Sequence, residues 1–282
     1  MKVAACNSKC HSNKMHLGSR KNDFLDLIIS LLKRSNVKDE FIELCLLKKE
    51  KFGRAFTSSS ADAILNYEYY EQIGDGTINK FIVAYMYNRF PQLKTTEGVE
   101  VVARLKIKYS SKGQLFQIAE RLGFWQFISA SDEIRTKRKK SLLEDVFEAF
   151  FGCTEEIVNE TIHEIKGFYF PGVGYDICWS ILSSIFDELQ INIDYDFLVD
   201  AKTKLKELFD EYRDSNLKYK DIQCPETKMF ISSVYNKEKF LGSGKSPLKR
   251  EAQEKAADEA LKNLKRLGII KKIPIQYRQF SK

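Results

Sequence analysis

Two acidic clusters hold the residues of this chain whose types and spacing could do chemistry. Glu68, Glu71 and Asp75 recur at spacings of three and four, and Asp145 and Glu148 repeat the spacing of three further along. On a helix such spacings place like charges on one face, where they repel. Both clusters stand among large apolar residues, and carboxylates crowded in a partly apolar setting need a proton or a cation. Hard oxygen ligands of this kind suit Mg²⁺ or Mn²⁺.

Spacing alone leaves a second interpretation open, in which the clusters are the solvated faces of two amphipathic helices. The residues around the clusters favour the chemical interpretation. Four segments, Ala55–Ser60, Glu68–Asp75, Asn88–Pro91 and Leu143–Gly152, occur in an order and at spacings that resemble the nuclease domain of the ribonuclease III family. The resemblance covers residues 50–160 and includes both acidic clusters together with the segments between them.

The resemblance implies an endoribonuclease that binds double-stranded RNA and hydrolyses phosphodiester bonds in both strands. By the same resemblance, the catalytic residues are Glu71, Asp75, Asp145 and Glu148, which hold one or two Mg²⁺ ions, with Mn²⁺ as a substitute. Glu68 matches a family residue that supports the site from outside the set of metal ligands. The products would carry 5′-phosphate and 3′-hydroxyl ends, and two sites across a homodimer would cut both strands.

Three departures from the family leave the expected metal ligands in place, and the first of them bears on the expected dimer. Gln72 occupies the position where family members usually have a phenylalanine that anchors the dimer, and Ser58 stands where a histidine is usual. Residues 153–175 match the family poorly. The alternative function is a non-catalytic double-stranded RNA-binding or scaffold protein on a nuclease-derived fold. Because such proteins lose the acidic residues and this chain keeps all four, the enzyme is the favoured interpretation.

The second part of the chain is basic. Residues 201–282 carry a net charge of +9, whereas residues 1–200 carry a net charge of −2. A basic module indicates a polyanionic ligand, with solubility as the alternative role of the charge. The pattern predicts a helix over 202–212, strands over 217–224, 228–236 and 237–242, and a last helix with Ser246 as its cap and Pro247 in its first turn. This α-β-β-β-α order resembles a double-stranded RNA-binding domain, which reads the shape of the duplex.

Several residues of this module are candidates for RNA contact. The N-terminus of the last helix gathers basic side chains where the helix dipole already favours anions. One loop position, between the first two strands, stands where the family usually has a histidine that enters a minor groove. The candidates are Lys202 and Lys206 on the first helix, Thr227 in that loop, and Lys245, Lys249 and Arg250 at the start of the last helix.

The expected fold is multidomain, with an all-α nuclease domain and a small α+β domain for double-stranded RNA. No strand alternation appears before residue 200. Helices are expected over 24–32, 41–52, 66–90, 99–109, 115–122 and 176–190, with a loop over 168–175. The expected domains are a partly disordered N-terminal extension (1–37), the nuclease domain (38–190), a linker (191–200), the RNA-binding domain (201–267) and a basic tail (268–282).

Composition and the termini set the expected context of the protein. No stretch approaches about eighteen apolar residues, so no membrane span is expected. The N-terminus lacks the apolar run of a secretory signal, and we expect an intracellular protein, cytoplasmic or nuclear. Its six cysteines are then reduced. The expected partners are double-stranded RNA and a second copy of the chain, bound through apolar residues such as Tyr70 and Ile73.

The N-terminal tail carries one further pattern. Cys6 and Cys10, with either His11 or His16, have spacings that a zinc site could use. The favoured interpretation is a polar tail with incidental thiols.

Overall fold

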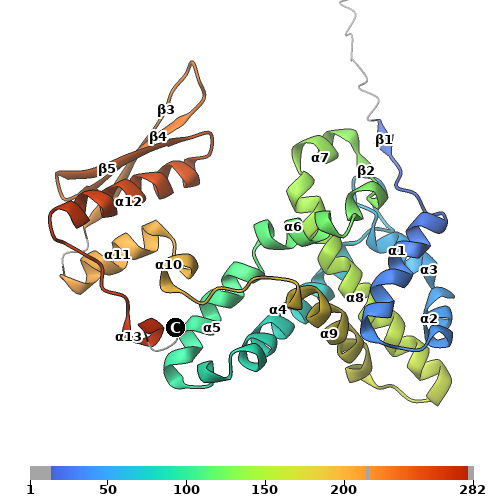
Figure 1. Ribbon diagram of the computed structural model, residues 1–282. Helices are drawn as coiled ribbons and strands as arrows, with labels where there is room; N and C mark the ends of the chain where they lie inside the picture. Colours follow the sequence, from blue (N-terminus) through green and yellow to red (C-terminus); the bar gives the residue numbers. More distant parts are fainter. Residues whose placement is uncertain (1–13, 214–215, 279–282) are drawn as a thin grey trace, which may run out of the picture. The chain divides into compact units, whose positions relative to one another are not determined.

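The computed structural model describes residues 14–213 and 216–278, and the chain divides into two compact units (Figure 1). The first unit comprises Met1–Pro91 and Leu105–Gln190, and the second comprises Gln92–Arg104 and Ile191–Lys282. Cys6, Cys10 and His11 lie outside the described residues. Within those described ranges, none of the helices combines the length and apolar character that crossing a bilayer requires.

The first unit is helical, as the apolar pattern predicts. Its only named strands among the described residues are two-residue segments, β1 (Met15–His16) and β2 (Ala130–Ser131), which pair antiparallel. A further helix, α5 (Thr96–Tyr109), begins in the second unit and ends in the first. The helices of the first unit are α1 (Asn22–Leu32), α2 (Asp39–Leu46), α3 (Lys49–Ala55), α4 (Glu68–Arg89), α6 (Lys112–Arg121), α7 (Asp132–Lys137), α8 (Lys139–Lys166) and α9 (Pro171–Asp187).

The longest of these helices, α8, forms the centre of the first unit and packs against α3, α4, α6 and α9. Its apolar residues are buried on several faces, with Phe147, Phe150 and Phe151 fully covered. The Phe150 ring stacks on Phe52 of α3 at 6.0 Å between centroids and meets Phe124 edge-on at 5.8 Å. Because these contacts fix the rotation of α8, they also fix the direction of the acidic residues in the same turns.

The first unit begins earlier in the chain than the predicted nuclease domain. Helix α1 buries Phe24 and Ile28 in the core of the unit, and the Phe24 ring meets the ring of Phe56 edge-on at 5.2 Å. Within the segment predicted as an N-terminal extension, β1 and α1 are therefore both paired or packed with the first unit.

Two local predictions in the first unit are wrong. The helix expected over 41–52 is two helices, because Lys48 has a non-helical backbone conformation between α2 and α3. The loop expected over 168–175 ends at Phe170, and α9 begins at Pro171, whose fixed φ is compatible with the first turn of a helix. Gly167, with φ of 75°, ends α8 in the left-handed conformation that favours glycine.

The second unit contains a three-stranded antiparallel sheet with strand order β3-β4-β5. Its elements are α10 (Tyr195–Leu198), α11 (Ala201–Glu211), β3 (Leu217–Gln223), β4 (Phe230–Asn236), β5 (Lys239–Ser246), α12 (Lys249–Arg266) and α13 (Ile275–Arg278). The predicted α-β-β-β-α order is confirmed as α11, the three strands and α12. The predicted linker and tail also contribute structure, because Tyr195 of α10 meets Tyr277 of α13 at 5.0 Å between ring centroids.

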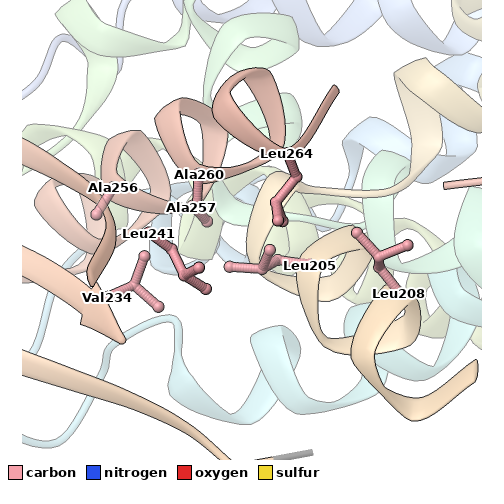
Figure 2. Packing of buried hydrophobic residues seen from close by; sticks show 8 residues of the cluster. All are labelled: Leu205, Leu208, Val234, Leu241, Ala256, Ala257, Ala260 and Leu264. Carbon is pink, nitrogen blue, oxygen red and sulfur yellow. The ribbon is translucent and has the colours of Figure 1, made fainter. Parts of the chain in front are cut away.

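Small residues let α12 lie close on the sheet. Figure 2 shows the core that the sheet, α12 and α11 form together, built from Leu205, Leu208, Val234, Leu241, Ala256, Ala257, Ala260 and Leu264. A Cβ atom added at Gly242 of β5 would lie 2.6 Å from the backbone nitrogen of Ala260, so the strand and the helix touch through their backbones. The alanine face read from the sequence is the face that packs.

The predicted start of α12 is wrong by a few residues. Ser246 is the last residue of β5, where it pairs with Phe230, and its hydroxyl donates a hydrogen bond to Glu251 at 2.5 Å. Pro247 follows it, which is consistent with an extended conformation of the preceding residue. The helix begins at Lys249 after Leu248, which provides no side-chain cap.

Candidate active site

The acidic faces of α4 and α8 meet because the two helices approach backbone to backbone. A Cβ atom added at Gly74 of α4 would lie 1.8 Å from the carbonyl oxygen of Glu148. One added at Gly152 of α8 would lie 2.1 Å from the carbonyl oxygen of Tyr70. Only glycine fits at either position without moving a backbone. The two glycines therefore allow the crossing that brings the acidic residues of both helices together.

The four predicted catalytic acids lie around this crossing. Glu148 is buried, with 9% of its surface exposed, and Glu71 is half-buried. Burial raises the pKa of Glu148 to about 8, and the charges of Asp75, Glu144, Glu71 and Asp145 add to the effect. Burial and then the neighbouring carboxylates, Asp145 first, raise the pKa of Glu71 to about 7. The acids of α4 and α8 therefore act on each other across the crossing.

The four acids do not converge as ready-made metal ligands. Across residues 14–213 and 216–278, no three His, Cys, Asp or Glu side chains are arranged closely enough to hold a metal ion. Asp75 is the exposed member of the set, and its Oδ1 accepts a hydrogen bond from Asn79 Nδ2 at 2.6 Å. The arrangement is a cluster of mutually repelling carboxylates at one helix crossing.

One tyrosine orients the acid at the start of the second cluster. The Tyr67 hydroxyl donates a hydrogen bond to Asp145 Oδ2 at 2.8 Å. Burial raises the pKa of Asp145, and the hydrogen bond from Tyr67 partly offsets that rise. The Tyr67 backbone N–H donates to the carbonyl of Thr57 at 2.9 Å, which ties the tyrosine to the segment before α4. In the sequence Tyr67 is only an apolar neighbour of the first cluster, so its role as a hydrogen-bond donor was not predicted.

A lysine from a distant helix also reaches the cluster. Lys112, at the start of α6, forms an ion pair with Glu144, whose pKa is raised by burial. The charges of Glu144, Asp145 and Glu148 in turn raise the pKa of Lys112, against the effect of its own burial. No spacing in the sequence connects residue 112 with either acidic cluster, and sequence reasoning missed it.

The surroundings of the first cluster differ in part from the prediction. Glu68 is exposed, and its charge contributes to the raised pKa of Glu71; its supporting role stays a prediction. Tyr70, expected at a dimer surface, is instead 1% exposed inside its own chain, and the Arg54 guanidinium lies 5.3 Å from the centroid of its ring. The prediction for Tyr70 is therefore wrong, because the close crossing with α8 covers that side of the helix.

The predicted RNA-binding residues lie on the second unit in two groups. Lys245, Lys249 and Arg250 are exposed around the start of α12. Lys202, near the start of α11, lines a surface cavity of about 640 Å³ together with Arg250. Lys206 is exposed on α11 and lines a neighbouring cavity of about 340 Å³ that also includes Lys202.

Thr227 is exposed in the turn between β3 and β4, and its hydroxyl accepts a hydrogen bond from the Met229 N–H at 3.4 Å. The two basic groups are joined at the cavity that Lys202 and Arg250 share, and Thr227 stands in a turn that contributes no basic candidate.

Comparison with known proteins gives family matches in both parts of the chain. The Ribonuclease III domain family matches residues 68–154, and the Double-stranded RNA binding motif family matches residues 201–264. Two viral proteins named "Putative ribonuclease 3" are similar to this chain. That of Invertebrate iridescent virus 6 is 42% identical over 282 residues, covering 94% of this chain and 96% of the relative. That of Frog virus 3 is 34% identical over 250 residues, covering 85% and 62% respectively.

A solved nuclease domain of ribonuclease III from Campylobacter jejuni superposes with a TM-score of 0.41 and 21% identity, covering 57% of this chain and 96% of that domain. The long match to a viral relative and the two family matches agree with the helix crossing and with the three-stranded second unit. The chain therefore belongs to the ribonuclease III family, as an endoribonuclease whose nuclease domain is followed by a double-stranded RNA-binding domain.

Proposed function

We propose that this endoribonuclease hydrolyses both strands of double-stranded RNA at the crossing of α4 and α8, with Mg²⁺ as its cofactor, and leaves 5′-phosphate and 3′-hydroxyl ends. The observation that carries the proposal is the cluster of Glu71, Asp75, Asp145 and Glu148, whose burial and mutual repulsion raise the pKa of Glu148 to about 8. A site built to work with these groups as carboxylates needs a compensating cation.

The residues present fit a hard divalent cation. Every side chain in the cluster offers carboxylate oxygen, and this donor set suits Mg²⁺ or Mn²⁺ better than metals that prefer nitrogen or sulfur. Glu71 and Asp75 from α4, with Asp145 and Glu148 from α8, would hold the ion. When bound, Mg²⁺ activates a water molecule and neutralises charge that develops on the phosphate.

The other residues of the site position these ligands. The Tyr67 hydroxyl holds one oxygen of Asp145 and leaves the other free for a cation. Lys112 balances the charge of Glu144, so that an additional carboxylate beside the cluster is compensated within the protein. The close contact at Gly74 and Gly152 fixes the backbones of α4 and α8, so that side-chain rotation alone would have to bring the carboxylate oxygens to the ion.

Duplex binding is assigned to the second unit. The basic residues at the starts of α11 and α12 would contact phosphates, and Thr227 would lie at a minor groove. Phosphate contacts release counterions, so affinity should fall steeply with salt and depend little on sequence. We expect residues 201–267 to supply most of the affinity for duplex RNA.

A homodimer would allow two sites to cut both strands. Support comes from an apolar surface just before and within the first turn of α4, where Ile64, Leu65 and Tyr69 are 82%, 57% and 50% exposed. Exposed apolar residues gathered in so short a segment are typical of a protein interface. This surface replaces the Tyr70 contact that the sequence indicated.

The proposal is tested with the full chain and a long RNA duplex. Cleavage should require Mg²⁺, stop on addition of chelator and resume when Mg²⁺ is restored. Phosphatase should remove a phosphate from the 5′ ends of the products. The 3′-hydroxyl ends should accept a ligated oligonucleotide. Cleavage in excess chelator, or products with 3′-phosphate ends, would contradict it.

A further inference from the structure

One acidic side chain lies among the basic residues of the RNA-binding domain. Asp221 is in the middle of β3 and pairs across the strands with Ser232 of β4. Its side chain is only 14% exposed, because it points to the face of the sheet that α12 covers. An acid at this position requires compensation from the helix.

Two predicted RNA-binding lysines provide that compensation. Lys249 Nζ lies 3.1 Å from Asp221 Oδ2, and Gln253 Nε2 donates a hydrogen bond to the same oxygen at 2.9 Å. Gln253 Oε1 in turn accepts a hydrogen bond from Lys202 Nζ at 2.7 Å. Lys249 and Gln253 are four residues apart on α12 and therefore share a face. A single carboxylate thus engages Lys249 directly and Lys202 through Gln253.

Lys249 and Asp221, the two partners of the ion pair, differ in their exposure to solvent. The Lys249 side chain is 58% exposed and could move into solvent, but the carboxylate of Asp221 would then remain in a largely covered place without its cation. Although burial alone would raise it, the pKa of Asp221 is lowered by its polar neighbours Ser232, Lys249 and Gln253, of which Lys249 and Gln253 lie within hydrogen-bond distance of Oδ2. The carboxylate is therefore charged at neutral pH, and Lys249 is held beside it.

Arg250 differs from its neighbour in this respect. It is exposed, and it makes no hydrogen bond or ion pair with any other residue in the described ranges. An RNA phosphate approaching the start of α12 therefore meets a guanidinium at Arg250 that no described residue holds in an ion pair, although Asp200, Glu251 and Glu254 line the same cavity, and an ion pair with no net charge at Lys249.

We infer that Asp221 weakens duplex RNA binding by holding Lys249 as one half of an ion pair, so that Arg250, with the exposed Lys245, carries the phosphate contact at the start of α12. The inference rests on the proposed role of this domain in duplex binding. Asp221 acts through Lys249 and is a positioning residue that sets the strength of binding and its salt dependence.

The test measures binding of the full chain to a long RNA duplex in chelator, between about 0.05 and 0.3 M salt. Asp221→Asn keeps the size of the side chain and an acceptor for Gln253. It should bind about three to ten times more tightly. The slope of log affinity against log salt concentration should become steeper by about 0.9, the value of one added phosphate contact. Adding Lys249→Ala to this variant should remove the gain.

The second arm compares removal of the whole ion pair with removal of the unpaired cation. Removing the pair by Asp221→Asn together with Lys249→Ala should change affinity by less than about twofold, because the pair carries no net charge, whereas Arg250→Ala should weaken it about tenfold and reduce the salt slope by about 0.9. Thermal melts followed by circular dichroism check that each variant is folded.

The outcomes separate the inference from the proposed function. Weaker or unchanged binding by folded Asp221→Asn, or equal losses for the double replacement of Asp221 and Lys249 and for Arg250→Ala, would overturn the inference and leave duplex binding intact. Failure of the unchanged chain to bind duplex RNA at low salt would overturn the proposed function and the inference with it.

Discussion

Gly74 of α4 and Glu148 of α8 are in backbone contact, since a Cβ atom at residue 74 would lie 1.8 Å from the carbonyl oxygen of Glu148. We expect Gly74→Ala to push the helices apart, to destabilise the protein by about 1–3 kcal/mol and to reduce cleavage at least tenfold. Gly76→Ala is the matched control on the same helix, because nothing lies within 4 Å of its added Cβ. The control should be neutral or slightly stabilising, as alanine favours a helix by about 0.5–1 kcal/mol over glycine. Melting and cleavage assays that rank the two variants alike would contradict this account of the crossing.

The hydrogen bond from Tyr67 to Asp145 should matter for metal use. In Tyr67→Phe the carboxylate loses the donor that fixes one of its oxygens, so the Mg²⁺ concentration for half-maximal cleavage should rise several-fold. Tyr69→Phe removes a hydroxyl two residues away that donates to Glu156, outside the cluster, and should leave that concentration unchanged. A titration of the initial rate with Mg²⁺ compares the two. Identical curves for Tyr67→Phe and the unchanged chain would show that the hydrogen bond has no such role.

Stability of the metal-free protein should depend on pH through Glu148. Burial and the neighbouring acids raise its pKa to about 8 in the folded chain, against 4.5 for an ordinary glutamate. The folded state therefore keeps a proton that the unfolded state releases, and this stabilisation is complete below about pH 4.5 and lost as the pH rises through 8. In chelator, the melting temperature should fall between pH 5 and pH 8, on the order of 5 °C.

Two comparisons identify the group responsible for this pH dependence. Glu148→Gln should flatten the decline, because it cannot ionise. Mg²⁺ should restore stability to the unchanged chain at pH 8, where the carboxylates are charged. A decline that is equally steep in Glu148→Gln would assign the effect to other groups.

The apolar surface of Ile64, Leu65 and Tyr69 should control assembly. Ile64→Glu places a charge on a residue that is 82% exposed, so it should leave the fold intact and shift a dimer to monomer. Leu47→Glu makes the same change at another exposed apolar residue of the first unit, 75% exposed, and should have no effect on assembly. Light scattering at micromolar concentration measures both, and a dimer that survives Ile64→Glu would place the interface elsewhere.

The sequence predicts the helical first unit, the α-β-β-β-α second unit and the acids of both clusters, because each depends on local periodicity or on a family motif. It does not predict Lys112, whose pairing with Glu144 arises from the packing of α6 against α8. The start of α12 differs from the prediction because Ser246, a residue type that favours helix caps, is instead the last residue of β5. Pairing with Phe230 decides between the two, and that contact depends on the sheet register.

The charge pattern has a similar limit. Lys249 reads as a free cation in the sequence, since Asp221 is far from it along the chain and reaches it only when β3 lies under α12. The sequence pattern also indicates an exposed position for Tyr70, because the helix that covers this residue comes much later in the chain.

Cleavage of a long RNA duplex by Glu148→Gln tests the central claim most directly. The replacement keeps the size of a buried side chain and removes its charge, so folding and duplex binding should persist while cleavage falls by at least about a thousandfold. Glu164→Gln is the control on the same helix, since Glu164 pairs with Lys48 at 2.7 Å, outside the acidic cluster. The account predicts that only Glu148→Gln remains bound to uncut duplex in Mg²⁺. Cleavage by Glu148→Gln at the rate of the unchanged chain would contradict it.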